Sequence, residues 1–285
     1  MWRLRASGAL ATDRLEERQL GAAAEERADG RAERLERVGA HVRIERGLVG
    51  VHLEHPQQVG LDGETRYDGV FAIWYAKGPG VDRSGDAIRH GNLFGTAEHG
   101  GVLLLLGDDH ICESSTTAHQ SEYAMVDALV PVLNPAGVQE ILEYGLIGIA
   151  MSRFTGGWVA LKCVHDTVES TASIAVDPAL PEIRIPDDFA LPPGGLNIRW
   201  PDNGIGQRMA LAQEARVHTH KLDAARAFAR ANRLDRVVVG GPNAWFGVVT
   251  TGKSWLDVIA ALDDLGIDDA RARELGLLVY KVGMV

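Results

Sequence analysis

The stretch that decides the fold is Gly100–Glu122, GGVLLLLGDDHICESSTTAHQSE. Two glycines precede five consecutive apolar residues, Val102–Leu106, and a third glycine then introduces Asp108, Asp109 and His110. An apolar run of this length between glycines predicts a strand buried on both faces, as in a parallel sheet. Open α/β sheets bind ligands outside the carboxyl ends of their strands. The polar residues after this strand are therefore the first candidate site.

The segments around this strand alternate between strand-like and helix-like patterns. The predicted strands are Val70–Tyr75, Val130–Leu133 and Trp158–Val164, and the predicted helices are Ser84–Phe94, Gln120–Leu129 and Ala136–Phe154. Between the first strand and the first helix, the Gly-Pro-Gly at 78–80 predicts a tight turn. Alternation of this kind predicts an α/β fold in which helices flank a parallel sheet.

A second, smaller α/β unit is predicted near the C-terminus. A proline-rich loop over 166–204 and a long helix over 205–232 lead to it. Its predicted elements are strands at 237–239, 247–251 and 277–282 and helices at 254–265 and 268–275. These are too few for a sheet covered on both faces, so we expect an incomplete unit. The expected divisions are 1–55, 56–165, 166–234 and 235–285.

Residues 1–55 differ in composition from the rest of the chain. They hold ten arginines and no lysine, mixed with alanine, glutamate and glycine. Part of 12–38 has good helix formers, but its apolar stripe is thin, so a weakly ordered, solvated arm is expected. A wrong reading frame in GC-rich DNA also produces an amino-acid sequence of this composition. Both interpretations stay open at this point.

Composition limits the class of protein. The net charge of −10 and the lack of a basic patch argue against nucleic-acid binding. Cys112 and Cys163 are the only cysteines, so a disulfide framework, a cysteine zinc site and an iron–sulfur cluster held by this chain are not expected. No apolar run is long enough to span a bilayer, and no signal-peptide core opens the chain. A cytoplasmic location is expected.

Several residues after the central strand could bind a ligand. Two aspartates and a histidine are followed by serines, a glutamine and a glutamate, which suit a polar ligand, a phosphate or a metal; the set is Asp108, Asp109, His110, Ser114, Ser115, Gln120 and Glu122. The competing interpretation is a polar loop whose hydroxyls cap the next helix. Residue types alone leave both possibilities open.

Three other patterns carry weaker signals. Gly247–Ser254 fits the phosphate-loop pattern G-x-x-x-x-G-K-S, but its inner residues, VVTT, resemble a strand, so Ser254 is expected to cap a helix. His218 and His220 are two apart on a predicted helix and should point to different faces, which makes a poor metal pair. Cys112 has no basic neighbour in sequence and is expected to be a partly buried residue and not a nucleophile.

Five phrases together resemble one family. They are YDGVFAIWYAKGPGVDRSGDAIRHGN (67–92), GGVLLLLGDDHICESSTTAHQSE (100–122), PVLNPAGVQEILEYG (131–145), LPPGGLNIRWPD (191–202) and VTTGKSWLDVIAALDDLGID (249–268). The chain resembles the fused indolepyruvate ferredoxin oxidoreductases, within the thiamine-diphosphate-dependent 2-oxoacid:ferredoxin oxidoreductases. The resemblance runs from about residue 57 to residue 285.

The resemblance implies a fold, a reaction and a site. It implies that 56–165 is a pyrimidine-type thiamine diphosphate domain and that 235–285 is part of a transketolase C-terminal-like domain. The implied reaction is oxidative decarboxylation of aryl-pyruvates with coenzyme A, electrons passing through iron–sulfur clusters to ferredoxin. Arg83 falls near the position at which related enzymes have a basic residue that pairs with the substrate carboxylate, a task that suits a guanidinium. Asp108, Asp109, His110, Ser114, Ser115 and Glu122 match the loop around the cofactor pocket. A homodimer is also implied.

The chain departs from the family pattern at decisive places. It contains no G-x-N-E motif, whose glutamate acts on the aminopyrimidine, and no G-D-G motif for magnesium and diphosphate. No catalytic residue and no metal ligand is therefore assigned. We expect a fragment that is inactive unless another polypeptide supplies the missing parts. The alternatives are a non-catalytic relic or interaction module and, less favoured, a nucleotide-binding protein that uses Gly247–Ser254.

Overall fold

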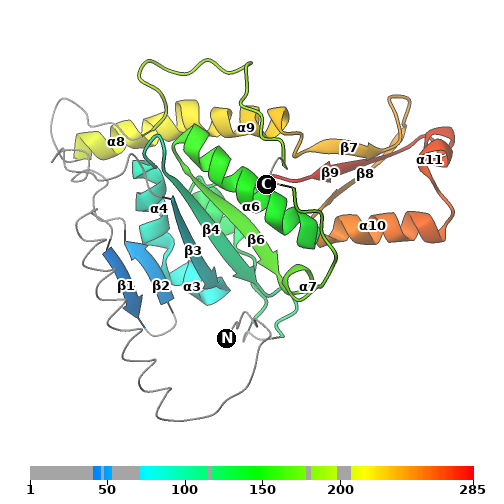
Figure 1. The fold of residues 1–285 in the computed structure, drawn as a ribbon, viewed down its shortest axis with the longest axis horizontal. Helices are drawn as coiled ribbons and strands as arrows, with labels where there is room; N and C mark the ends of the chain where they lie inside the picture. The colour runs from blue at the N-terminus through cyan, green and yellow to red at the C-terminus, as the bar shows by residue number, and fades with distance from the viewer. Residues whose placement is uncertain (1–40, 46–47, 53–70, 114–116, 178–180, 198–206) are drawn as a thin grey trace, which may run out of the picture.

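A six-stranded sheet forms the main body of the protein (Figure 1). The computed structural model describes residues 41–45, 48–52, 71–113, 117–177, 181–197 and 207–285. The strand order is β1-β2-β3-β4-β6-β5, and the last four strands run parallel to one another. Their bounds are β1 His41–Glu45, β2 Leu48–His52, β3 Phe71–Lys77, β4 Gly101–Asp108, β5 Val132–Leu133 and β6 Trp158–Val164. The predicted parallel sheet flanked by helices is confirmed.

Two strands lie within residues 1–55, the segment for which a weakly ordered arm is expected. Strands β1 and β2 pair with each other in antiparallel register, and β2 pairs antiparallel with β3 at Val49 and Tyr75. The sheet is therefore mixed. Alternating β-branched residues in HVRIE and LVGVH favour strands, a signal that the surrounding arginines concealed. Residues 1–40, with the expected helix at 12–38, lie outside the described residues.

Helices cover both faces of the parallel strands. On one face, α3 (Gly78–Arg83), α4 (Gly85–Phe94) and α5 (Glu122–Asp127) pack on a core that includes Leu104 and Trp158. On the other face, α6 (Val138–Thr155) packs on a core that includes Leu103 and Val159. Because side chains alternate along a strand, β4 is apolar on both faces and is buried by both helix layers.

The tight turn expected at the Gly-Pro-Gly is instead the first turn of helix α3. Gly78 begins this helix, and Pro79 lies in its first turn, where the missing N–H of proline costs no hydrogen bond. Helix α6 ends as predicted, at Gly156, which adopts the left-handed conformation with φ 64°. A short helix, α7 (His165–Val168), follows β6.

The predicted long helix near residues 205–232 contains a π-helical turn. It consists of α8 (Gln207–Arg216), the π-helix η1 (Val217–Lys221) and α9 (Leu222–Ala231). Lys221, the last residue of η1, is buried, and its Nζ donates a hydrogen bond of 2.8 Å to the carbonyl of Gly156 at the end of α6. The irregular turn therefore lies where this helix is attached to the main body.

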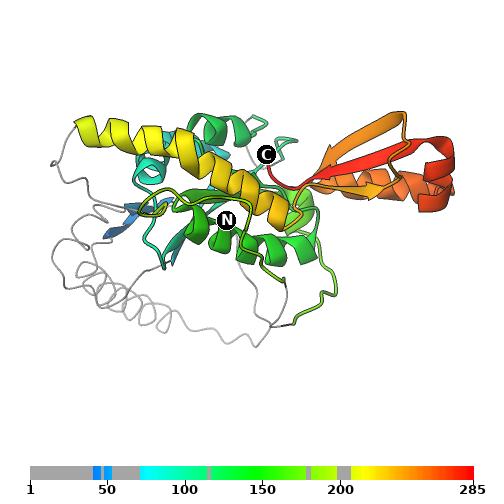
Figure 2. The same cartoon turned by 90° about the horizontal axis from the view of Figure 1, so that it is seen from above.

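The C-terminal unit projects from the main body (Figure 2). Its three-stranded sheet has the order β7-β9-β8, with β7 Arg236–Val239, β8 Phe246–Thr251 and β9 Leu277–Val282. Helices α10 (Lys253–Asp264) and α11 (Asp269–Leu275) accompany it. Val279 of β9, which pairs with Val248 of β8, is fully buried. Val249, the next residue of β8, points to the opposite face of the sheet and is 70% exposed. The second, smaller sheet was correctly predicted.

The chain end joins the two units. The amide of Val132 in β5 donates to the carbonyl of Val285 at 3.0 Å, and the return bond is 2.8 Å long. The backbone amide of Asn134 donates to the carbonyl of Gly283 at 2.9 Å. The Asn134 side chain also donates to the Thr251 hydroxyl at 3.1 Å. The C-terminal residues thus extend the main sheet beside β5.

Candidate functional site

Asp108 is the centre of the polar cluster at the carboxyl end of β4. Its side chain is fully buried, which requires partners for both carboxylate oxygens. The Ser121 hydroxyl donates to Oδ1 at 2.6 Å, and the Ser121 amide donates to Oδ2 at 3.0 Å. Ser121 is also the residue before α5, but its side chain makes no capping bond. The hydroxyl therefore serves the strand end and does not cap the helix.

Lys162 supplies a cation to this cluster. It lies on β6, the strand beside β4, and only 3% of its side chain is exposed. Its Nζ lies 3.6 Å from Asp108 Oδ2 and forms a hydrogen-bonded ion pair with Glu122, the first residue of α5. Burial by itself would raise the pKa of the Glu122 carboxyl, but the hydrogen bond and charge of Lys162 together hold that pKa below its ordinary value.

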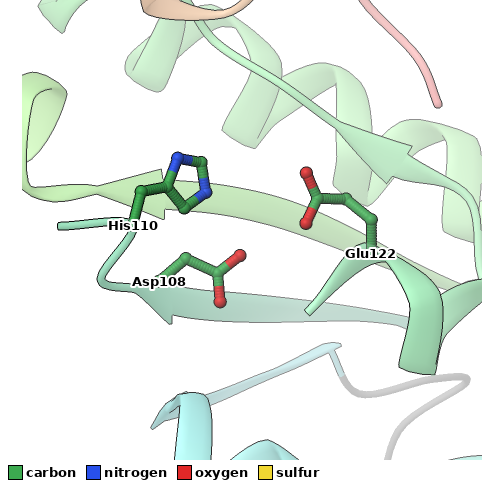
Figure 3. A group of neighbouring side chains, drawn as sticks. All are labelled: Asp108, His110 and Glu122. Atoms are coloured by element: carbon green, nitrogen blue, oxygen red, sulfur yellow. The ribbon is translucent and has the colours of Figure 1, made fainter. Parts of the chain in front are cut away.

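Asp108, His110 and Glu122 point toward one another (Figure 3), and their ligand atoms lie within 4.8 Å of each other. Such a group could hold a cation by its donor types. Lys162 already balances the charge of both carboxylates, and Asp108 Oδ2 also accepts the Ser121 amide. Because the internal ammonium fills the electrostatic role of a metal, we assign no metal to this group.

Glu122 keeps one oxygen available. Its Oε1 bonds to Lys162, whereas its Oε2 is buried and lacks a hydrogen-bond partner among the described residues. A buried carboxylate oxygen without a donor is costly, so this position favours a bound N–H or O–H group. This atom marks the part of the cluster that can receive a ligand.

His119 links the cluster to helix α3. Its Nδ1 lies 3.3 Å from Asp108 Oδ1, and its Nε2 lies 3.1 Å from Asp82 Oδ2. The Asp82 side chain is 62% exposed, whereas that of His119 is 15% exposed. A line of charged or polar groups thus leads from the surface to the buried strand end.

The remaining predicted site residues are placed as follows. Asp109 is buried and its Oδ1 accepts the amide of Glu113 at 2.9 Å, a role within the loop. His110 is exposed but contributes to the charge around Glu122. Arg83 is exposed at the end of α3, next to Asp82. Ser114 and Ser115 lie outside the described residues.

Sequence reasoning missed three members of the cluster: Asp82, His119 and Lys162. Lys162 lies inside the apolar run WVALKCV, and a lone lysine within a buried strand was the available signal. Its register opposite Leu106, two residues before Asp108, follows only from the parallel pairing of β4 with β6. Asp82 and His119 are 37 residues apart, and nothing in their local patterns connects them.

The weaker sequence candidates do not form sites. Residues 247–251 lie in strand β8, Gly252 precedes α10, and Lys253 pairs with Asp257 at 2.9 Å, so these residues do not form a phosphate loop. Ser254 does not cap α10, contrary to expectation, since Gly252 holds that position.

Burial, together with the charge of Asp108, raises the pKa of the Cys163 thiol to about 11. No helix among the described residues could cross a membrane.

Comparisons with known proteins found similarity to one group of enzymes. A family model described as the indolepyruvate oxidoreductase domain matches residues 236–285. The indolepyruvate oxidoreductase subunit IorA of Methanothermobacter thermautotrophicus is 24% identical over 200 residues, which are 70% of this chain and 31% of that protein. The chain therefore spans about a third of the length of this curated relative. Both matches are to indolepyruvate oxidoreductases.

A further match is to a solved structure. It is a 2-oxoglutarate:ferredoxin oxidoreductase from Magnetococcus marinus with 2-oxoglutarate, coenzyme A and succinyl-CoA bound. The TM-score is 0.47 and the identity is 12%, with 74% of this chain and 41% of that chain covered.

Proposed function

We propose that the cluster at the carboxyl end of β4 forms one wall of a thiamine diphosphate pocket in a 2-oxoacid:ferredoxin oxidoreductase. The observation that carries the proposal is the unpaired, buried Oε2 of Glu122 beside the Asp108–Lys162 pair. It is an acceptor without a donor at the edge of the sheet where α/β proteins bind ligands. The sequence matches to the indolepyruvate oxidoreductases support the choice of cofactor.

The residues present fit the aminopyrimidine part of the cofactor. Glu122 would accept a hydrogen bond from an N–H group, and Lys162 keeps that carboxylate ionised and in place. Asp108 and Ser121 form the rigid support behind it. When bound, thiamine diphosphate supplies the carbanion chemistry that 2-oxoacid decarboxylation requires.

The other parts of the proposal come from the resemblance and the matches. Arg83 would pair the carboxylate of an aryl-pyruvate, because an exposed guanidinium can form two parallel hydrogen bonds to it. Magnesium, iron–sulfur clusters, coenzyme A and ferredoxin would engage other domains or subunits of the complete enzyme. A homodimer, a cytoplasmic location and the division into domains at residues 55, 165 and 234 belong to the same proposal.

We propose further that this chain is not active alone. It lacks G-x-N-E and G-D-G motifs and has two cysteines in total. In a dye-reduction assay with indolepyruvate and coenzyme A, the purified chain should show no turnover. Turnover by the isolated chain would contradict this part of the proposal.

A direct test is an NMR titration of the labelled chain with thiamine diphosphate and magnesium. Millimolar cofactor should shift the amide signals of Asp108, Ser121 and Glu122, and the signals of α10 should serve as an unchanged control. Glu122→Gln should weaken the response, because the amide replaces half of the acceptor capacity with a donor. A pocket whose signals do not move would refute the proposal and favour a non-catalytic interaction module.

A further inference from the structure

The imidazole of His119 lies between two carboxylates from different elements. Asp82 belongs to α3, and Asp108 ends β4. Its Nδ1 lies 3.3 Å from Asp108 Oδ1 and its Nε2 lies 3.1 Å from Asp82 Oδ2, both within hydrogen-bond distance. His119 therefore links α3 to the end of β4.

Gly78 provides the space for this ring. A Cβ built on Gly78 would lie 2.2 Å from His119 Cγ and 2.3 Å from Nδ1. These atoms belong to a ring held at both nitrogens, so the ring could not turn away without losing a carboxylate. The first residue of α3 and the histidine are therefore fitted to each other.

Arg83 follows Asp82 directly in the same short helix. The apolar contact of α3 with the core is made by Val81, which is fully buried. Arg83 itself is exposed and takes part in no hydrogen bond or ion pair found among the described residues. Two contacts of α3 with the main body lie next to Arg83: the burial of Val81 in the core and the Asp82–His119 contact.

We propose that His119 is a positioning residue, which fixes helix α3 to the carboxyl end of β4 and thereby holds Arg83 at the candidate site. The attachment of α3 stands on the contacts of His119, whereas its consequence for Arg83 rests on the proposed function. The ligand group that Arg83 would bind in this position is the carboxylate of a 2-oxoacid.

The attachment can be tested without any ligand, by combining Gly78→Ala with His119→Ala. Gly78→Ala alone should lower the melting temperature by about 3 °C, because the methyl group displaces the ring. In the His119→Ala background the same change should be neutral or stabilising, since alanine favours a helix more than glycine does. Equal effects of Gly78→Ala in both backgrounds would overturn the proposal. Asp82→Asn, at an exposed carboxylate, provides a second variant should His119→Ala fold poorly, and it too should lower the melting temperature.

The consequence for Arg83 is tested by the affinity of the chain for phenylpyruvate. Arg83→Met and His119→Ala should each weaken binding about tenfold, and the double variant should lose little more than either single one. His90→Ala, at an exposed histidine paired with Asp86, is the matched control and should have no effect. Losses that multiply would overturn the positioning role of His119. A wild-type chain that binds no 2-oxoacid would refute the proposed function, whereas the melting temperatures would still decide the attachment.

Discussion

At the scale of single residues, the candidate site is a line in which carboxylates alternate with basic side chains: Asp82, His119, Asp108, Lys162 and Glu122. Each inner member is buried or nearly so, and each has partners on two sides. Removing one member therefore leaves its neighbours uncompensated, and that loss exceeds the value of a surface ion pair. The line explains how a buried strand end tolerates several ionisable groups.

Lys162→Met should lower the free energy of unfolding by about 3–5 kcal/mol, because Asp108 and Glu122 would lose their shared cation in a buried site. The measurement is urea denaturation at pH 7. Lys253→Met is the matched control, because Lys253 pairs with Asp257 on the surface and its loss should change the stability little. Similar losses in the two variants would contradict the central role of Lys162.

The two cysteines should react at very different rates with a thiol reagent at pH 8. The pKa of Cys163 is raised to about 11, so little reactive thiolate forms, and its side chain is largely buried. Cys112 lies in the partly exposed loop after β4 and should account for the fast phase. Cys112→Ser should remove that phase, and both thiols should react in denaturant. A fast phase that survives Cys112→Ser would refute this prediction.

At the scale of elements, the helix α8–η1–α9 is attached to the main body through a buried lysine. Lys221 Nζ reaches the carbonyl of Gly156 at the end of α6, a position where a cation also meets the negative end of the helix dipole. Burial, with a smaller contribution from Arg216, lowers the pKa of Lys221 to about 8. Burial therefore disfavours the charged form of Lys221, although its Nζ donates to the carbonyl of Gly156.

This lysine should make stability depend on pH. Between about pH 8 and the unfolded value of 10.5, the unfolded chain binds more protons than the folded chain, so stability rises with pH. From pH 7.5 to pH 10, wild type should gain about 2–3 kcal/mol relative to Lys221→Met, which lacks the titrating group. Urea denaturation at both pH values measures the difference. A difference that stays constant with pH would show that Lys221 is not buried as described.

At the scale of the whole molecule, a buried ion pair and the chain end join the two units. Lys281 in β9 is fully buried and pairs with Glu140 in α6, beside the Tyr144 ring at 5.8 Å and the Trp255 ring at 5.7 Å. Burial and the charge of Glu140 raise the pKa of Tyr144 to about 12. The C-terminal unit is thus held by specific polar contacts with the main body.

Glu140→Ala should destabilise the protein by about 3–5 kcal/mol, because Lys281 would remain buried without its carboxylate. Hydrogen exchange should increase in β7 and β9 as well as in α6, since the pair joins both units. Glu182→Ala is the control, because Glu182 pairs with Arg184 at the surface and its removal should change little. Faster exchange confined to α6 would argue against coupling of the units.

The sequence by itself determined the fold class and most of the elements. The runs VLLLL and WVALKCV are apolar at every or nearly every position, and this pattern is specific to strands covered on both faces. Helix periodicity and the glycines at 156 and 157 likewise predicted α6 and its end. It also indicated Asp108 and Glu122, because polar residues after a buried strand lie at a known edge of the sheet.

Only the tertiary structure decided which residues meet at that edge. The contacts of Asp108 with Lys162, and of His119 with Asp82, join positions 54 and 37 apart in the chain. Such pairs depend on strand register and on the approach of α3 to β4, and neither leaves a periodic signal in the sequence. The physical reason is that a buried charge must find its partner in space. Which partner it finds is set by packing and not by the local pattern of residues.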